Sequence, residues 1–133
     1  LAGVRERMVN LQREMGRGGG AVLEGRDIGT VVFPEADYKF YLDASLEERA
    51  QRRFRELRAK GFRVNLKEVE EEVVVRDRED KSRDIGPLKV AEGAIVIDST
   101  GMSIEEEVQA VLEHIRLVDP VRPVKRSFVG IFL

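Results

Sequence analysis

The first part of the chain carries hydrophobic residues at helical spacing. Four of them recur every three or four positions: Val4, Met8, Leu11 and Met15. This period predicts an amphipathic helix over residues 2–15. The same kind of pattern predicts three more helices, over residues 46–60, 66–83 and 104–115.

Three short hydrophobic runs lie between the helical patterns. Residues 21–24 are expected to form a short buried strand, and residues 38–42 a strand rich in aromatic side chains. Residues 94–98 are apolar up to Asp98, as in a strand that a parallel sheet buries on both faces. Strands that alternate with helices predict an α/β domain with a mostly parallel sheet.

The expected helix starts carry capping residues. Ser45 and Glu48 have the spacing of a capping box, in which each side chain bonds the backbone N–H of the other residue. Ser103 and Glu106 repeat this spacing at the last helix. Asn65 is expected to cap the helix that follows it.

The composition restricts the class of protein. The 133 residues suffice for one domain, and 36% of them are charged around a net charge of −2. This balance favours neither nucleic acid nor a membrane as a partner. Without Cys and with one His, the chain has no disulfide, no Cys nucleophile and no expected protein metal site. No signal peptide or 18-residue apolar run occurs, so we expect a cytoplasmic protein.

A turn bracketed by glycines follows the first expected strand. Arg26 and Asp27 stand between Gly25 and Gly29, and a second apolar run begins at Thr30. Turns at the carboxyl ends of buried strands are where α/β folds bind ligands. A guanidinium suits a phosphate and a carboxylate supplies a fixed acceptor, so we interpret this turn as half of a binding site.

The third expected helix carries charge on the face that begins as its apolar side. Arg76, Asp80 and Arg83 share one face and continue the stripe begun by Leu66 and Val69. Two interpretations are open: a solvated helix end held by ion pairs, or one wall of a cleft for a charged ligand. The Arg–Asp turn elsewhere in the chain favours the cleft.

Five segments match one known pattern in chain order. They are residues 24–34, Leu42-Asp43-Ala44-Ser45, Lys60-Gly61-Phe62, Arg76-Asp77 with Asp80 and Arg83, and Ile97-Asp98-Ser99-Thr100. Together they resemble the bacterial cytidylate kinases, over about residues 4–117. The resemblance implies a three-layer, parallel-sheet fold of the P-loop kinase type. It also implies transfer of the γ-phosphoryl group of ATP to CMP or dCMP, with Mg²⁺ as cofactor and no nucleic acid or membrane partner.

The resemblance assigns roles to six residues of the CMP site. Arg5 and Asp27 would recognise the cytosine ring, with help from Arg83. Arg26 and Arg76, the expected catalytic residues, would hold the CMP phosphate. Asp80 would accept hydrogen bonds from the ribose hydroxyls. Four further arginines are candidates for the ATP phosphates and the lid: Arg49, Arg52, Arg53 and Arg63.

The chain departs from the family pattern on its N-terminal side. The family begins with a strand and a Gly-rich loop that ends in Lys-Ser/Thr and cradles the ATP phosphates, and this motif is absent from the sequence. We therefore expect residues 1–118 to be a kinase domain truncated at the N-terminus, with a lid region at about 56–66. Such a chain would show little or no turnover alone.

The tail over residues 119–133 matches nothing in the family pattern. It contains Pro120 and Pro123 and ends in the apolar run 128–133. Three alternatives are open for this run: an edge strand, a packed arm or the start of a further segment.

Two other functions compete with the kinase. The first is a non-catalytic nucleotide-binding or protein-interaction module derived from such a kinase, which would self-associate through an exposed sheet edge or the apolar tail. The second is an Arg-rich RNA binder, against which the net charge and the lack of a basic stripe argue.

Overall fold

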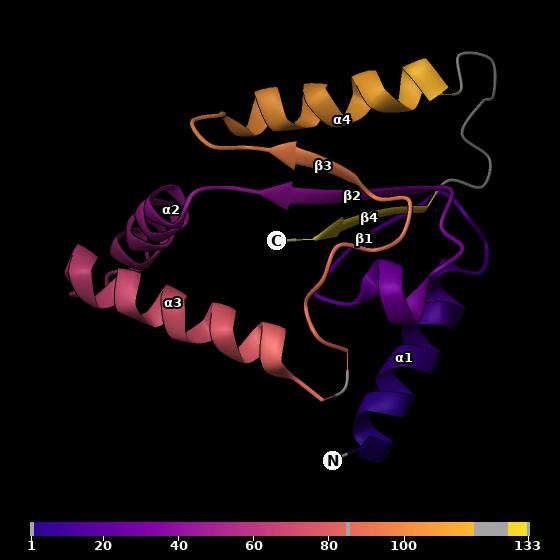
Figure 1. The fold of residues 1–133 in the computed structure, drawn as a ribbon, viewed down its shortest axis with the longest axis horizontal. Coiled ribbons are helices and arrows are strands. Elements are labelled where there is room, and N and C mark those ends of the chain that lie inside the picture. Colours follow the sequence, from indigo (N-terminus) through magenta and orange to yellow (C-terminus); the bar gives the residue numbers. More distant parts are fainter. Residues whose placement is uncertain (1, 85, 119–127, 133) are drawn as a thin grey trace.

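The computed structural model describes residues 2–84, 86–118 and 128–132. Its elements are α1 (Ala2–Gly16), β1 (Ala21–Glu24), the π-helix η1 (Ile28–Val32), β2 (Tyr38–Asp43), α2 (Leu46–Ala59), α3 (Leu66–Ser82), β3 (Ile95–Asp98), α4 (Ile104–Val118) and β4 (Phe128–Phe132). In Figure 1, α4 runs along one side of the strands and α1 lies on the opposite side. Helices α2 and α3 lie beyond the arrowheads of β2 and β3.

The four strands form one parallel sheet in the order β1-β4-β2-β3. Parallel strands connected through helices confirm the predicted α/β class. All strands end at the same edge of the sheet, and α2 follows the end of β2 after two residues. The polar residues that come after β1, β2 and β3 therefore lie along one edge, which is where parallel sheets bind ligands.

The main core lies between the sheet and α4. Phe40 has no exposed surface and packs with Leu42 and Ile97. From α4, Val111 and Ile115 pack against this cluster. The second half of the apolar side predicted for the last helix thus covers β2 and β3. Ile104 and Val108, on the first half of that side, are 75% and 49% exposed, so their predicted burial is wrong.

Two strand predictions overstate burial. Val22 of β1 is 68% exposed, and Val96 of β3 is 54% exposed. The predicted burial of residues 21–24, and of residues 94–98 on both faces, is wrong. Both strands lie at edges of the sheet, where a strand has one neighbour and less cover from helices.

The last described strand, β4, lies inside the sheet. β4 pairs with β1 on one side and with β2 on the other. The edge-strand alternative for the tail is therefore wrong for residues 128–132. β1 and β2 are consecutive in the chain but do not pair with each other, because β4 lies between them. The hydrophobic pattern could not reveal this strand order. Residues 119–127 and 133 lie outside the described residues.

One capping box forms completely and the other forms by half. The Ser103 hydroxyl accepts from the Glu106 N–H, and the Glu106 carboxylate accepts from the Ser103 N–H at 2.7 Å. Ser45 also accepts from the Glu48 N–H. However, the Ser45 N–H donates to Thr100 Oγ1 at 2.9 Å, and the Glu48 carboxylate turns to an arginine of α2. The reciprocal half of the first box is therefore wrong, because Thr100 takes its place.

Helix α3 begins at the predicted cap and ends one residue early. The Asn65 side chain accepts from the Glu68 N–H at 2.9 Å. Arg83, predicted inside the helix, is its C-cap with φ −61° and ψ 133°. Residues 56–59 of the predicted lid belong to α2, so only residues 60–65 connect the two helices.

Candidate functional site

The turn after β1 is a short helix anchored in the protein interior. The Val31 and Val32 N–H groups both donate to the Asp27 carbonyl, at 2.8 and 3.2 Å. Arg13 of α1 donates to the carbonyls of Val31 and Val32, at 2.7 and 3.0 Å. Ile28 and Val32 are each 2% exposed. This packing fixes the backbone on which the two candidate ligand-binding residues stand, a feature that the sequence pattern did not reveal.

Arg5 and Asp27 form an ion pair above Gly86. Arg5 Nη2 donates to Asp27 Oδ2, and both side chains are partly buried. Gly86 has a φ of +63°, and a β-carbon there would overlap the Arg5 guanidinium and lie 2.7 Å from Asp27 Oδ2. Only glycine meets both demands at this position. The structure thus brings together the two residues predicted to recognise the base.

Arg26 and Arg83 share one buried carboxylate. Asp80 is 1% exposed, with its Oδ2 2.9 Å from Arg26 Nε and its Oδ1 2.5 Å from Arg83 Nη2. The second contact is an ion pair without hydrogen-bond geometry, so Oδ1 has no hydrogen-bond partner among the described residues. Burial of Asp80 rules out a solvated helix end for this residue and supports the cleft interpretation.

A pocket of about 300 Å³ opens between the strand ends and the α2–α3 pair. Five arginines predicted for nucleotide phosphates line it: Arg26, Arg49, Arg52, Arg53 and Arg76. Leu42, Asp43 and Ala44, at and after the end of β2, line it too. Guanidinium groups from three separate segments favour a ligand with several anionic oxygens.

Arg49 connects α2 to α3 at this pocket. Its Nη1 lies 2.6 Å from Asp77 Oδ1, and its Nε donates to the Ala44 carbonyl at 3.1 Å. An anion that binds Arg49 must therefore compete with Asp77. Burial raises the pKa of Tyr41 nearby, and the charge of Asp43 acts in the same direction. Tyr41 is thus a neutral phenol at pH 7.

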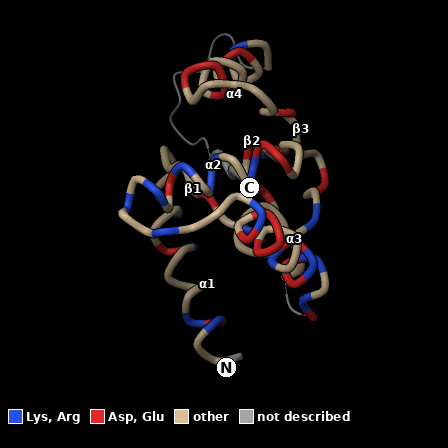
Figure 2. Tube along the Cα trace, turned by 90° about the vertical axis from the view of Figure 1, so that its left-hand side faces the viewer, with Lys and Arg blue, Asp and Glu red and all other residues tan. Residues whose placement is uncertain are grey.

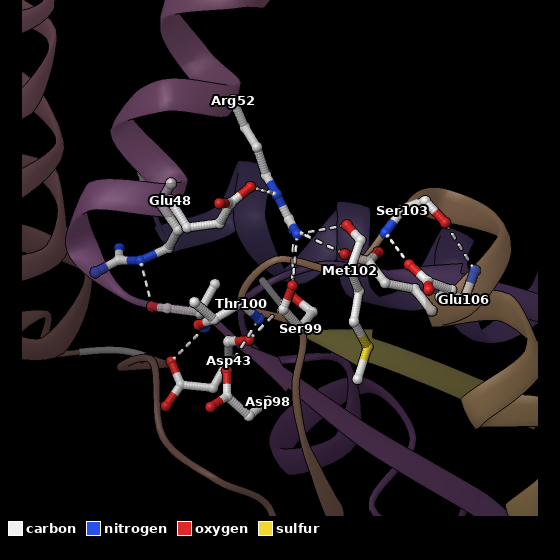
Figure 3. A network of polar contacts seen from close by, with 12 residues as sticks. Asp43, Glu48, Arg52, Asp98, Ser99, Thr100, Met102, Ser103 and Glu106 are labelled. Atoms are coloured by element: carbon white, nitrogen blue, oxygen red, sulfur yellow. Dashed lines mark hydrogen bonds and ion pairs between the residues drawn. The ribbon is translucent and has the colours of Figure 1, made fainter.

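Arg52 is engaged by protein groups on several sides (Figure 3). Its Nη2 donates to the carbonyls of Ser99 and Met102, at 2.7 and 3.3 Å. Its Nε and Nη1 pair with Glu48 and Glu107, at 2.9 and 2.8 Å. These contacts join α2 to the loop after β3. The geometry therefore favours a structural role for Arg52 over direct phosphate binding.

The remaining lid candidates occupy different surroundings. Arg53 pairs with Glu56 at 3.0 Å on its own helix and lines the five-arginine pocket. Arg63 lies in the loop between α2 and α3, beside Phe62 and Arg58, and does not line that pocket. Figure 2 shows residues of both charge signs along α3. The charged helix therefore offers counter-ions as well as cations to this region.

One known protein family matches this chain over most of its length. The family model for cytidylate kinase matches residues 1–117. The chain belongs to the cytidylate kinase family. This confirms the resemblance drawn from the five sequence segments.

Curated members of the family are similar over most of this chain. The cytidylate kinase of Geobacter sulfurreducens is 57% identical over 103 residues, which cover 77% of this chain and 44% of that protein. The cytidylate kinase of Caldicellulosiruptor bescii is 52% identical over 110 residues, or 83% of this chain and 49% of that protein. That of Carboxydothermus hydrogenoformans is 53% identical over 115 residues, or 86% and 52%. The chain spans about half the length of these relatives.

Two features are absent from the described part of the chain, a metal-binding cluster and a membrane-spanning helix. No group of three or more His, Asp or Glu side chains there could hold a metal ion. No helix in the same part is long and apolar enough to cross a membrane.

Three residues contribute to the site although sequence reasoning assigned them no role in it. Asp77 neutralises Arg49, Gly86 supplies space beneath the Arg5–Asp27 pair, and Arg13 fixes η1. Gly86 had a visible signal, since Gly-Pro marks the end of a helix, but the close approach of Arg5 left no trace in the sequence. Asp77 and Arg13 look like ordinary charges on helices.

Proposed function

We propose that this chain forms the nucleoside monophosphate side of a kinase that transfers the γ-phosphoryl group of ATP to CMP or dCMP. The observation that supports it most is the adjacency of two ionic groups in a member of this family. The Arg5–Asp27 pair and the Arg26–Asp80–Arg83 group meet at one turn, because Arg26 and Asp27 are consecutive residues. Because the chain spans about half the length of its relatives, the activity is proposed for a longer protein.

In this proposal, Asp27 and Arg5 select the base. Cytosine presents an N4 amino group, which a carboxylate accepts, and ring acceptors, which a guanidinium satisfies. Asp27 binds Arg5 through Oδ2, so Oδ1 is the oxygen proposed for the amino group. Uracil presents a carbonyl at that position, and two facing acceptors repel each other. The pair therefore supplies both attraction to cytosine and rejection of uracil.

Arg26 and Arg76 are proposed to bind the CMP phosphate, and both line the five-arginine pocket. Phosphoryl transfer requires in-line positioning and stabilisation of charge on the transferred group, and no side chain has to act as a nucleophile. Arg49 and Arg53 line the same pocket and would add positive charge near the transferred group. Asp80 orients Arg26 and is proposed to receive a ribose hydroxyl at Oδ1.

Magnesium is proposed to arrive with ATP. Mg²⁺ keeps several water ligands and binds substrate phosphates with only one or two carboxylates, so a protein-built metal site is not required. Carboxylates do reach the pocket, from Asp43 and Asp77. Asp43 makes no ion pair within the described residues, which leaves its charge available to hydrated metal.

A steady-state assay with MgATP tests the proposal. The proteins compared are this chain and a longer form in which a segment with a Lys-Ser/Thr phosphate loop precedes it. We expect the longer form to phosphorylate CMP and dCMP and to reject UMP, and the chain alone to show little or no turnover. No CMP phosphorylation by the longer form would contradict the kinase. Ordinary turnover by the chain alone would contradict the division into two sides.

A non-catalytic nucleotide-binding module is the second candidate. It is favoured by the carboxylates that already pair with pocket arginines, Asp77 with Arg49 and Glu48 with Arg52. This candidate shares the prediction of CMP binding and differs in turnover. A longer form that binds CMP and ATP but transfers no phosphoryl group would support it.

A further inference from the structure

Helix α1 faces the turn of the proposed base site with two arginines and one apolar residue. Arg5, Val9 and Arg13 are spaced i, i+4 and i+8, so they share one face of the helix. Val9 packs against the buried apolar residues of η1. The members of the predicted apolar stripe are exposed instead, by 61%, 51% and 80% for Val4, Met8 and Met15. The contacts of the two arginines therefore contribute much of what fixes α1 against η1.

The two arginines bracket η1. Arg5 meets the carboxylate of Asp27, which is the N-cap residue of η1. Arg13 reaches the other end, where its Nη2 and Nε donate to the carbonyls of Val31 and Val32 at 2.7 and 3.0 Å. The last carbonyls of a helix have no partner inside it and favour a cation, so a guanidinium is well suited to this end.

Asp27 does not cap the helix that it begins. An N-cap aspartate usually accepts a hydrogen bond from a backbone N–H of the first turn, and the Asp27 side chain makes no such bond. Its carboxylate turns to Arg5 instead. Asp27 joins the turn through its backbone, since its carbonyl accepts from the Val31 N–H at 2.8 Å. Arg13 therefore acts on Asp27 through a single residue, because Val31 bonds Arg13 with its carbonyl and Asp27 with its N–H.

We propose that Arg13 is a positioning residue for base selection: it fixes η1 from its far end and thereby holds the Asp27 carboxylate toward the base. This inference rests on the proposed function, in which Asp27 distinguishes cytosine from uracil. A hydrogen-bonding group selects its ligand only when neighbouring contacts hold it within about 0.5 Å of its place. Arg13 supplies such support from outside the five-arginine pocket, which it does not line.

Titration calorimetry of this chain with CMP and UMP tests the inference, with Arg13→Met as the variant. Methionine keeps an apolar stem and removes every side-chain donor. Arg7→Met is the matched control, because Arg7 is exposed on the same helix and the same charge is lost. We expect the parent chain and Arg7→Met to bind CMP at least about ten-fold more tightly than UMP, and Arg13→Met to reduce this ratio to about three-fold or less.

Arg13→Lys separates geometry from charge. Lysine keeps the cation but lacks the planar fork that spans two carbonyls, so its CMP-to-UMP ratio should lie between those of the parent chain and Arg13→Met. The ratio is the informative quantity. A loss of stability alone would lower the apparent affinities for CMP and UMP by the same factor and leave their ratio unchanged.

The outcomes separate this inference from the proposed function. If the folded parent chain prefers CMP and Arg13→Met keeps that preference, the inference is wrong and the proposed base selection stands. Equal loss of preference in Arg7→Met and Arg13→Met would show an effect of charge on α1 and would also overturn it. Equal binding of CMP and UMP by the parent chain would overturn the proposed function and the inference with it. If Arg13→Met does not fold, Arg13→Lys decides, and a ratio equal to that of the parent chain overturns the inference.

Discussion

Arg26 Nε lies 2.9 Å from Oδ2 of Asp80, so the turn after β1 is held by the last part of α3. Asp80 is 1% exposed, and the Arg26 side chain is 26% exposed. A charge this deeply buried is stable only with a partner of opposite sign. The pair therefore does two things: it places a cation beside the buried carboxylate, and it orients the guanidinium proposed to bind the CMP phosphate.

Replacing Asp80 by Asn should destabilise the protein strongly. The substitution leaves Arg26 without its counter-ion, and loss of one partner of a buried pair costs about 2–4 kcal/mol. Denaturant unfolding followed by circular dichroism measures the change. Asp77→Asn is the matched control on the same helix, because the Arg49–Asp77 pair is about one-third exposed and should cost about 1 kcal/mol or less. Equal losses in the two variants would contradict the special status of Asp80.

Replacing Gly86 by Ala should disturb the Arg5–Asp27 pair. The added β-carbon would overlap the Arg5 guanidinium, and φ is +63°. Gly93→Ala is the matched control, since Gly93 has a φ of +71° but open space around it. Each variant should lose about 1 kcal/mol from backbone strain. Only Gly86→Ala should also weaken CMP binding, and a similar weakening in Gly93→Ala would contradict the contact.

Replacing Asp77 by Asn should increase the affinity of the pocket for polyanions. Asp77 neutralises Arg49, so an arriving phosphate must displace it. Its removal should tighten the binding of inorganic tripolyphosphate about three- to ten-fold at low salt, and less at high salt because of screening. Glu72→Gln, on the same pocket wall, is the control. An unchanged or weaker affinity in Asp77→Asn would show that Asp77 does not compete with the ligand.

The capping box at α4 should make stability sensitive to acid. The backbone N–H of Ser103, followed by its hydroxyl, holds the pKa of Glu106 below its usual value of 4.5. A lowered pKa in the folded state stabilises the fold above the unfolded pKa, and this contribution disappears as the pH falls through the folded pKa. The thermal midpoint of Glu106→Gln should therefore fall less than that of the parent protein below about pH 4.5.

Glu105→Gln is the control for that titration, because Glu105 lies in the same first turn of α4. It should keep the acid dependence of the parent protein. If Glu106→Gln and Glu105→Gln shift the acid limb equally, the effect is a general one of charge on the helix terminus and the capping box is not responsible.

Local patterns predicted the elements well because their causes are local. Asn65 caps α3 and Ser103 caps α4 through side-chain bonds to backbone groups three residues away. The period of hydrophobic residues likewise follows from which side of α4 covers Phe40 and Ile97. Such features depend on neighbours within one or two turns, so the sequence contains them directly.

The features that sequence reasoning missed depend on distant parts of the chain. The exposure of Val22 and Val96 depends on the strand order. The place of β4 depends on the spacing of β1 and β2, which come far before it in the sequence. Within the site, the pairing of Arg26 with Asp80 was not anticipated, although both residues were chosen as ligand contacts. Residue type indicated the chemistry, and only the fold showed which charges neutralise one another.

Asp27 and Arg5 are proposed to distinguish cytosine from uracil, and titration calorimetry of this chain with CMP and UMP measures this preference. CMP should bind at least about ten-fold more tightly than UMP, and Asp27→Asn should abolish this preference. Asp37→Asn, an exposed residue before β2, should leave it intact. Equal binding of CMP and UMP by the folded parent chain would show that Asp27 and Arg5 do not select the base.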